Sequence, residues 1–287
     1  MADTAPDGFQ VVQIRPPGYI HAEALTELAE CVYFGLRRLG LRAFYQKRAD
    51  GPVRYIVIGG HLLGDRGFAV LPPGAILYNS EQVDPETTWL RGPYRAALET
   101  RPVWDYSEEN VRRLAALGVK PAQHVPLGYV PELARIPPAE EDIDVLFYGS
   151  VNPRRKRILD ALGDRGLKVV SLFGIYGTER DRAIARAKVV LSVHFYEAKI
   201  FEIVRAAYLF TNAKALVAEC GPDTAVDAEL REAMCAVPYE QLVEACVELV
   251  RDAPHRRALG ERAQRIFALR REEDILARTL GQPQPAG

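Results

Sequence analysis

Short apolar runs alternate with longer amphipathic stretches along most of the 287 residues of the chain. Apolar runs of this kind are typical of buried strands, whereas apolar residues three and four positions apart are typical of a helix with one packed face. In the first half, the pattern predicts strands at 9–14, 42–46, 55–58, 75–78, 103–106 and 124–127, and helices at 22–39 and 109–117. Strands that alternate with helices predict a parallel sheet covered by helices.

The alternation restarts after a break in composition at residues 135–144, which read RIPPAEEDID. Paired prolines followed by a cluster of acids are typical of a linker between domains, so we place a boundary between residues 135 and 136. In the second half, the pattern predicts strands at 144–148, 168–173, 188–195 and 215–218, and helices at 153–162, 179–187 and 200–210. After Cys220 it predicts helices alone, at 225–234, 239–252 and 255–280. The fold class is therefore α/β, with two Rossmann-like domains at residues 1–135 and 136–287.

Charge and cysteine content narrow the class of protein. The 37 Lys and Arg residues nearly balance the 38 Asp and Glu residues, which argues against a nucleic-acid-binding protein. The four cysteines form no C-x-x-C pair, and we expect packed thiols in a reducing compartment. There is no basic segment before an apolar core at the start and no apolar run of 18 residues. We therefore expect a cytoplasmic protein without a transmembrane span.

The predicted helix at 200–210, IFEIVRAAYLF, is apolar on all sides except for Glu202 and Arg205. These residues are three positions apart and share a face of the helix. Burying an unpaired carboxylate costs several kcal/mol, so the charges must be compensated. Two interpretations are open at this point. Either the pair neutralises itself, or both side chains face a cleft where a ligand shares them.

Polar residues and glycines follow each predicted strand of the second half. Ligands of open α/β sheets bind beyond the carboxyl ends of the strands. A glycine-containing turn before a helix, with arginines nearby, can hold a phosphate, and a carboxylate can accept hydrogen bonds from ribose hydroxyls. The candidate nucleotide-binding residues are Gly149, Ser150, Asn152, Arg154, Gly174, Tyr176, Gly177, Glu197, Lys199, Glu202, Arg205 and Glu219.

Three stretches of the second half carry a resemblance to a known family: DVLFYGSVNPRRKRIL, VVSLFGIYGTERDRAIARAKVVLSVHFY and FEIVRAAYLFTNAKALVAE. They resemble the nucleotide-binding domain of GT-B glycosyltransferases, in particular the bacterial "glycosyl transferases group 1" type that includes CgeB-like proteins. The first half is similar to the acceptor-side domain of these proteins through AILYNSEQV, VWDYSEENVRRL and HVPLGYVPEL. The resemblance covers residues 9–270.

The resemblance implies that a sugar moves from a nucleoside-diphosphate sugar to an acceptor, which would be a saccharide, a peptide or a small molecule. It implies two domains with parallel sheets facing a central cleft, and a terminal helix that crosses back to the first domain. It also implies that Glu202 contacts the ribose. Many members have a second glutamate eight positions earlier, where this chain has His194, and Glu197 and Glu219 are the alternatives for that role.

Relatives of this type generally stabilise the leaving diphosphate with basic side chains and helix N-termini, so we expect no cofactor and no metal. Asp142-Ile143-Asp144 matches the metal-binding D-x-D motif but precedes its strand, at the wrong end of the sheet. Inversion at the anomeric carbon would require a base. His61, Glu81 and Asp84 follow strands of the first half, and we select His61 and Glu81 as the catalytic candidates.

Two other functions are kept as alternatives: a GT-B-like sugar-nucleotide epimerase, and a non-catalytic relative that binds a nucleotide or a glycan. The arginine-rich segment 255–280 is interpreted as a solvated helix face, with contact to a membrane surface as the alternative. Nothing in the sequence indicates an oligomeric state.

Overall fold

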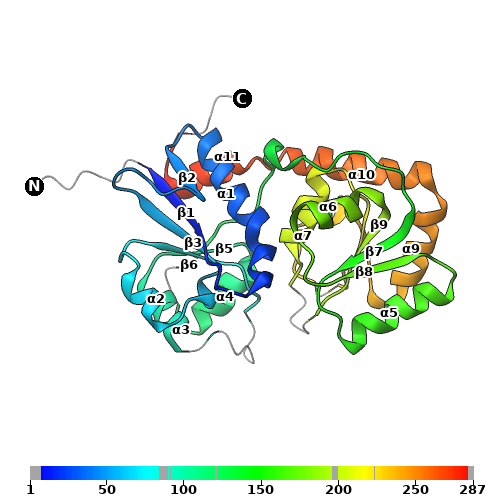
Figure 1. Cartoon of the computed structure of the whole chain (residues 1–287), viewed down its shortest axis with the longest axis horizontal. Coiled ribbons are helices and arrows are strands. Elements are labelled where there is room, and N and C mark those ends of the chain that lie inside the picture. Colours follow the sequence, from blue (N-terminus) through cyan, green and yellow to red (C-terminus); the bar gives the residue numbers. More distant parts are fainter. Residues whose placement is uncertain are drawn as a thin grey trace, which may run out of the picture. The chain divides into compact units, whose positions relative to one another are not determined.

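The computed structural model describes residues 8–83, 90, 92–119, 122–195, 200–222 and 224–283. The chain divides into two compact units. Unit 1 contains the residues up to Val130 and those from Arg271 onward, and unit 2 is Pro131–Arg270. The division falls earlier than the expected boundary at residues 135/136, because Pro131–Leu133 packs against a helix of unit 2. Each unit contains one parallel sheet with helices on its faces (Figure 1).

The sheet of unit 1 has six strands in the order β2-β1-β3-β4-β5-β6, and all neighbouring pairs are parallel. The strands are β1 (Phe9–Gln13), β2 (Ala43–Tyr45), β3 (Arg54–Ile58), β4 (Ile76–Asn79), β5 (Val103–Asp105) and β6 (Ala122–His124). The last strand was expected at 124–127 but ends at His124, because Pro126 has no N–H to continue the ladder. The carboxyl ends of β3, β4 and β5 are adjacent, so residues that follow these strands lie close together.

Helices cover both faces of this sheet. They are α1 (Thr26–Arg38), α2 (Asp65–Val70), α3 (Gly92–Thr100), α4 (Glu108–Ala116) and α11 (Glu272–Leu280). Short 3₁₀ turns at Ile20–Leu25 and Gly60–Leu62 follow β1 and β3. Wholly buried apolar side chains of β3, β4, α3 and α4 form the core on one face, among them Val57, Leu77, Leu98 and Leu114.

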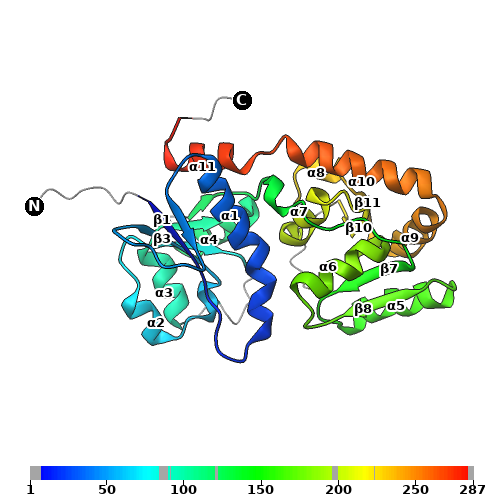
Figure 2. The ribbon, with the colours of Figure 1, turned by 45° about the horizontal axis from the view of Figure 1, so that its top comes forward.

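The helix α11 returns to unit 1 at the end of the chain and packs on α1 (Figure 2). Its buried carboxylate Glu272 accepts a hydrogen bond from the backbone N–H of Gly128 at 2.6 Å. Gly35 of α1 lies at the contact, where a Cβ would meet Glu272 and would lie 2.8 Å from Leu276. The absence of a side chain at Gly35 therefore allows the two helices to approach closely.

The sheet of unit 2 has five strands in the order β11-β10-β9-β7-β8, and all neighbouring pairs are parallel. The strands are β7 (Ile143–Tyr148), β8 (Val169–Leu172), β9 (Ala187–Ser192), β10 (Leu216–Glu219) and β11 (Cys235–Val237). The strand β11 was not expected from the sequence, because three residues between two helices carry too short a pattern. It completes the sheet by pairing with β10.

The helices of unit 2 are α5 (Pro153–Asp164), α6 (Gly177–Arg186), α7 (Ile203–Thr211), α8 (Ala228–Glu232), α9 (Leu242–Arg251) and α10 (Ala253–Ala268). Valines of β7, β9 and β10 pack against α5 and α9 on one face of the sheet. Leu146, Val190 and Leu216 alternate with these valines and are also buried, so the central strands are covered on both faces. In the part of the chain that the structure describes, no helix has the length and apolar character needed to cross a membrane.

The close approach at Gly35 leads to a stability prediction. We expect Gly35→Ala to destabilise the protein by about 1–3 kcal/mol, because the new methyl group overpacks the contact with α11 even though alanine favours helix. Gly163→Ala in α5 is the matched control, because a Cβ there meets no atom within 4 Å. Urea unfolding of both variants measures the effect. An unchanged or higher free energy of unfolding for Gly35→Ala would contradict the prediction.

Candidate functional site

The turn after β7 brings the backbone of unit 2 close to two arginine side chains. Gly149 has a φ of +133°, which disfavours any other residue. A Cβ at this position would lie 3.1 Å from Nη2 of Arg205 and 3.6 Å from Nη1 of Arg155. The guanidinium of Arg155 also donates to the carbonyl of Ser150 at 2.9 Å. The glycine predicted from its place at a strand end thus has a packing role as well as a conformational one.

Two guanidinium groups share the carboxylate of Glu202. Nη2 of Arg155 lies 2.7 Å from Oε1 of Glu202, and Nη1 of Arg205 lies 2.8 Å from Oε2. Arg155 also donates to the carbonyl of Val193 at 2.8 Å and lies against the ring of Phe147. Arg155 is therefore a buried cation with a structural role, whereas Arg157 on the same helix is exposed.

The Glu202–Arg205 pair combines features of both interpretations that the sequence left open. The carboxylate is compensated, but by two cations instead of one. Its side chain retains 21% of its exposure and that of Arg205 retains 13%, so neither is sealed in the core. Burial raises the pKa of Glu202, but Arg205 and Arg155 outweigh this effect and hold the pKa below its ordinary value. Glu202 is thus an anion at neutral pH.

A second ion pair lies at the same edge of the sheet. Both terminal nitrogens of Arg154 donate to the carboxylate of Glu219, the last residue of β10, at 2.6 and 2.5 Å. The guanidinium of Arg154 lies 3.9 Å above the ring of Tyr239, which orients it. Together with the first cluster, three guanidinium groups face two carboxylates. These five side chains carry one net positive charge, and Glu240 also acts electrostatically on Arg154.

Two buried nitrogens at this edge have no hydrogen-bond partner among the described residues: Nε of Arg205 and Nε2 of His194. The backbone N–H of His194 donates to Glu219 at 3.0 Å, which places the ring beside the Arg154 pair. Burial lowers the pKa of His194, and the imidazole is neutral at pH 7. Unsatisfied buried nitrogens at a strand edge are typical of positions where a ligand or water completes the hydrogen bonding.

The remaining predicted nucleotide-binding residues have different structural roles. Asn152 caps α5 by accepting from the N–H of Arg155 at 2.9 Å, so its side-chain oxygen already has a partner. Gly174, Tyr176 and Gly177 follow β8, which pairs directly with β7. Both of these glycines have positive φ and shape the turn into α6. Glu197 and Lys199 lie outside the described residues.

In unit 1, the structure brings together the two catalytic candidates. Nε2 of His61 lies 3.4 Å from Oε1 of Glu81. Burial lowers the pKa of His61 to about 4 and raises the pKa of Glu81 to about 7. Both shifts favour the neutral forms, so around pH 7 the pair consists of a neutral imidazole and a carboxyl group close to its midpoint. The third candidate, Asp84, lies outside the described residues.

The sequence analysis missed a buried polar network beside this pair. Asp105, at the end of β5, accepts from the amides of Asn79 at 2.6 Å and Asn110 at 3.0 Å. The hydroxyl of Tyr94 donates to the other side of the Asn79 amide at 3.1 Å, and its ring lies against His61. Asn79 is the last residue of β4 and is in register with Asp105. The strand-end rule that selected residues in the second half would have found both.

The D-x-D motif lies at the amino end of β7, away from the candidate site of unit 2. Asp142 accepts from Arg186 at 2.6 Å, and Asp144 accepts from Lys188 at 2.6 Å. Among the residues that the structure describes, no three His, Cys, Asp or Glu side chains are grouped so that they could hold a metal ion.

The chain has distant relatives by amino-acid sequence, and it resembles several solved structures in its fold. No protein-family model matches the chain. It is 30% identical over 116 residues to uncharacterized protein L138 of Acanthamoeba polyphaga mimivirus, and 26% identical over 184 residues to uncharacterized protein L140 of the same virus. The matches include 39% and 61% of this chain, but only 13% and 59% of the lengths of L138 and L140.

Solved structures cover almost the whole chain. Alr3699/HepE of Anabaena in complex with UDP-glucose superposes with a TM-score of 0.63 at 14% identity, over 95% of this chain and 98% of that one. WaaG, a glycosyltransferase involved in lipopolysaccharide biosynthesis, gives 0.57 at 13% identity over 97% and 100%. The chain has the GT-B fold. Its structural neighbours are GT-B glycosyltransferases. The resemblance to the CgeB-like type of these enzymes stays a prediction.

The buried Asp105 leads to a prediction on pH and stability. Burial raises its pKa from 3.8 to about 7, so between these values the folded state holds a proton that the unfolded state has lost. The free energy of unfolding should therefore fall as the pH rises through this window. Between pH 5 and pH 8, the fall in the free energy of unfolding should be smaller in Asp105→Asn than in the parent protein, by on the order of 2–4 kcal/mol.

Urea unfolding at several pH values measures this difference. Comparing each variant with the parent protein cancels the contribution of His61, which has the opposite sign. Asp160→Asn, at an exposed position of α5, is the control and should leave the pH dependence unchanged. If Asp105→Asn follows the same pH curve as the parent protein, Asp105 is not protonated in the fold.

Proposed function

We propose that the chain is a glycosyltransferase that moves a sugar from a nucleoside-diphosphate sugar to an acceptor without a bound metal ion. The observation that carries the proposal is the cluster of three arginines and two glutamates at the carboxyl edge of the unit 2 sheet. Its excess positive charge suits a diphosphate, and its anionic Glu202 suits ribose hydroxyls. The GT-B fold and the UDP-glucose complex of a structural neighbour support the same proposal.

The residues of the cluster divide the work of binding the donor. Glu202 accepts hydrogen bonds from the ribose, since its oxygens are ionised and partly exposed. Arg205 and Arg154 contact the diphosphate and stabilise the charge that develops on it as the glycosidic bond breaks. The turn at Gly149 and Ser150 and the loop at Gly174, Tyr176 and Gly177 border the donor. Glu197 and Lys199 are proposed as further donor contacts from their sequence positions alone.

The pair in unit 1 supplies the base if the reaction inverts the anomeric carbon. Glu81 is the better base, because a pKa of about 7 is matched to neutral pH, whereas His61 with a pKa of about 4 is a weak one. His61 then orients Glu81 through the 3.4 Å contact. The acceptor hydroxyl transfers its proton to Glu81 as its oxygen bonds to the anomeric carbon and the nucleoside diphosphate leaves. The acceptor is a saccharide, a peptide or a small molecule.

Thermal unfolding with UDP, GDP, dTDP, ADP and CMP tests donor binding. A nucleotide that binds the folded state at a hundredfold excess over Kd should add about 2.7 kcal/mol of stability. The corresponding sugar nucleotide is then incubated with the protein and its products are separated. Release of free sugar or transfer to an added acceptor supports the proposal. Conversion to an epimer identifies the epimerase instead, and binding without turnover identifies a non-catalytic relative.

The position of Glu202 leads to a binding prediction. Glu202→Ala should lower the affinity for the stabilising nucleotide about tenfold or more, because hydrogen bonds from hydroxyls to a carboxylate contribute about 1.5–3 kcal/mol. Glu261→Ala, at an exposed position of α10, is the matched control and should leave the affinity unchanged. Thermal shifts across a nucleotide titration measure both. Equal affinity in Glu202→Ala and the parent protein would contradict the ribose contact.

The pKa of Glu81 leads to a prediction on pH and rate. If Glu81 is the base, kcat/KM should rise with pH through a midpoint near 7, because only the carboxylate accepts the proton. Glu81→Gln should lower kcat by a factor of about 100–10,000, typical for loss of a general base, and should remove this midpoint. If kcat/KM instead has a midpoint near pH 4, and this midpoint disappears in His61→Gln, the base is His61.

A further inference from the structure

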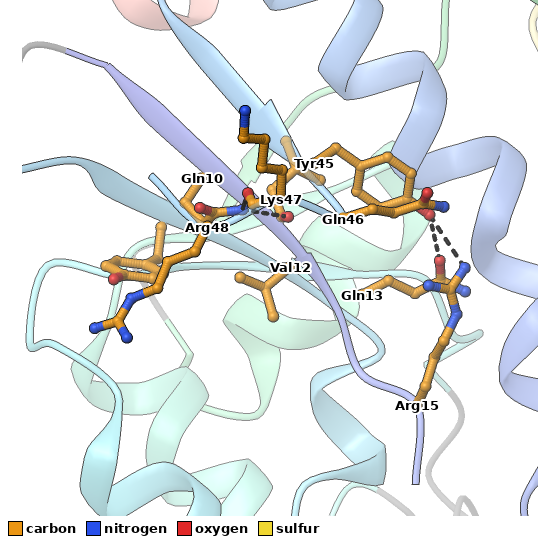
Figure 3. Close-up of a pocket in the computed structure, with 10 residues that line it drawn as sticks. Gln10, Val12, Gln13, Arg15, Tyr45, Gln46, Lys47 and Arg48 are labelled. Atoms are coloured by element: carbon orange, nitrogen blue, oxygen red, sulfur yellow. Dashed lines mark hydrogen bonds between the residues drawn. The ribbon is translucent and has the colours of Figure 1, made fainter. Parts of the chain in front are cut away.

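A pocket of 420 Å³ lies in unit 1 beside β1 and the edge strand β2, and its lining residues include neither His61 nor Glu81 (Figure 3). Its lining residues come from β1 and the segment that follows it, from the end of β2 and the segment that follows it, and from the start of β3. They are Gln10, Val11, Val12, Gln13, Arg15, Tyr45, Gln46, Lys47, Arg48 and Tyr55. The volume is within the range of about 300–1,000 Å³ that is typical of small-molecule sites.

The pocket exists because the edge strand is short. β2 ends at Tyr45, which pairs with Val11, whereas β1 continues to Gln13. The chain turns away at Gln46, whose φ of +57° is uncommon for a residue with a side chain. A backbone conformation of this kind costs about 1–3 kcal/mol and is concentrated at functional sites.

The walls of the pocket are held by hydrogen bonds. The buried amide of Gln10 donates to the carbonyl of Lys47 at 3.1 Å and accepts from the N–H of Ala49 at 2.8 Å, so it fixes the segment after β2. On the other wall, the hydroxyl of Tyr45 donates to Gln13 at 2.6 Å and accepts from Arg15 at 3.3 Å. These hydrogen bonds fix Gln10, Gln13 and Tyr45 before a ligand binds, whereas the exposed side chains of Lys47 and Arg48 would be ordered on binding.

The charge of the pocket is positive. Arg15, Lys47 and Arg48 line it, and none of its lining residues is acidic. Arg15 is paired with Glu23 at 2.9 Å, and the carboxylate of Asp50 acts electrostatically on Lys47, whereas Arg48 has no carboxylate partner among the described residues. The side chains of Arg48 and Arg15 lie on either side of Val12 (Figure 3). An anion in the pocket would thus find Arg48, which has no carboxylate partner among the described residues, beside Lys47 and Arg15, whose charges are partly offset.

The remaining lining residues suit a sugar. The amides of Gln10 and Gln13 already hold the walls of the pocket, whereas the exposed Gln46 carries an amide that can both donate and accept hydrogen bonds, as sugar hydroxyls require. Tyr45 and Tyr55 supply aromatic rings with polar ends, which combine an apolar surface with hydrogen bonding. A phosphate alone would use the cations but neither the rings nor the amides.

We propose that this pocket binds an anionic sugar, a hexose that carries one phosphate or carboxylate group. Arg48 and Lys47 contact the anionic group, while the rings of Tyr45 and Tyr55 and the amide of Gln46 contact the sugar ring and its hydroxyls. If the chain is the glycosyltransferase proposed above, this sugar would be a unit of the acceptor. The binding of the sugar to the pocket does not depend on that proposed function. Phosphate and carboxylate are two sources of the same charge, and the experiment separates them.

Ligand-observed NMR of the full chain tests the proposal at low ionic strength with glucose 6-phosphate, glucuronic acid, glucose and inorganic phosphate. At least one of the two anionic sugars should bind about tenfold more tightly than both glucose and phosphate. The double variant Lys47→Gln/Arg48→Gln should lose this preference and weaken binding about tenfold. Arg37→Gln/Arg157→Gln, at two exposed positions, changes the net charge equally and should bind as the parent protein does.

The possible outcomes show separately whether the pocket assignment fails and whether the proposed function fails. Equal binding of glucose and the anionic sugars, equal binding of phosphate alone, or equal loss in both double variants would overturn the pocket assignment. Preferential binding of a short DNA duplex, lost in Lys47→Gln/Arg48→Gln while no anionic sugar binds, would overturn it in favour of a nucleic acid. Selective binding of an anionic sugar together with an absence of donor binding and turnover supports the pocket and overturns only the transferase proposal.

Discussion

The carboxylate of Glu202 is shared by the guanidinium groups of Arg155 and Arg205, and the candidate donor site depends on this contact. A charged group that is removed from water needs an opposite charge nearby, and here two guanidinium groups compensate one carboxylate. Arg155 cannot move, because its other nitrogens bind the carbonyls of Val193 and Ser150. Arg205 and Glu202 are therefore held at the edge of the sheet with part of their surface exposed. Local structure is linked to the same contact, since a Cβ at position 149 would lie 3.1 Å from Arg205 and the φ of +133° disfavours any other residue.

The two units use burial in opposite ways. In unit 2, arginines offset the burial of Glu202, so the carboxylate stays ionised and can bind hydroxyls. In the described part of unit 1, no arginine pairs with Glu81 or Asp105, and burial raises both pKa values to about 7, in Asp105 against the lowering effect of three hydrogen bonds. An ionised acid suits binding, and an acid near its midpoint suits proton transfer. The difference in electrostatics therefore matches the division of roles between donor binding and base that we propose.

The candidate residues gather at strand ends because parallel strands expose their carboxyl ends on one edge. Asn79 and Asp105 are in register across β4 and β5, and Glu219 ends β10 next to β9. The pocket at β1 and β2 follows from the same geometry, since a strand that stops early leaves its neighbour's side chains uncovered. Residues far apart in the sequence thus become neighbours without any special local motif.

Much of the fold could be predicted from the sequence because apolar periodicity reports burial directly. The continuous apolar runs at β7, β9 and β10 predicted strands covered on both faces, and Asn152 with Pro153 predicted the start of α5. The pairing of His61 with Glu81 and the place of Glu202 beside Arg205 were also within reach of sequence reasoning. The three-residue strand β11 was not, because so short a segment carries no period.

Only the tertiary structure decided which charges meet. Arg155 lies forty-seven positions before Glu202, and no local pattern distinguishes it from the exposed Arg157 on the same helix. The protonation of Asp105 likewise depends on distant segments that remove water from around its carboxyl group. Sequence periodicity determines which faces are buried, because burial acts on each residue separately. Electrostatic character depends on pairs of residues, and the fold alone brings those pairs together.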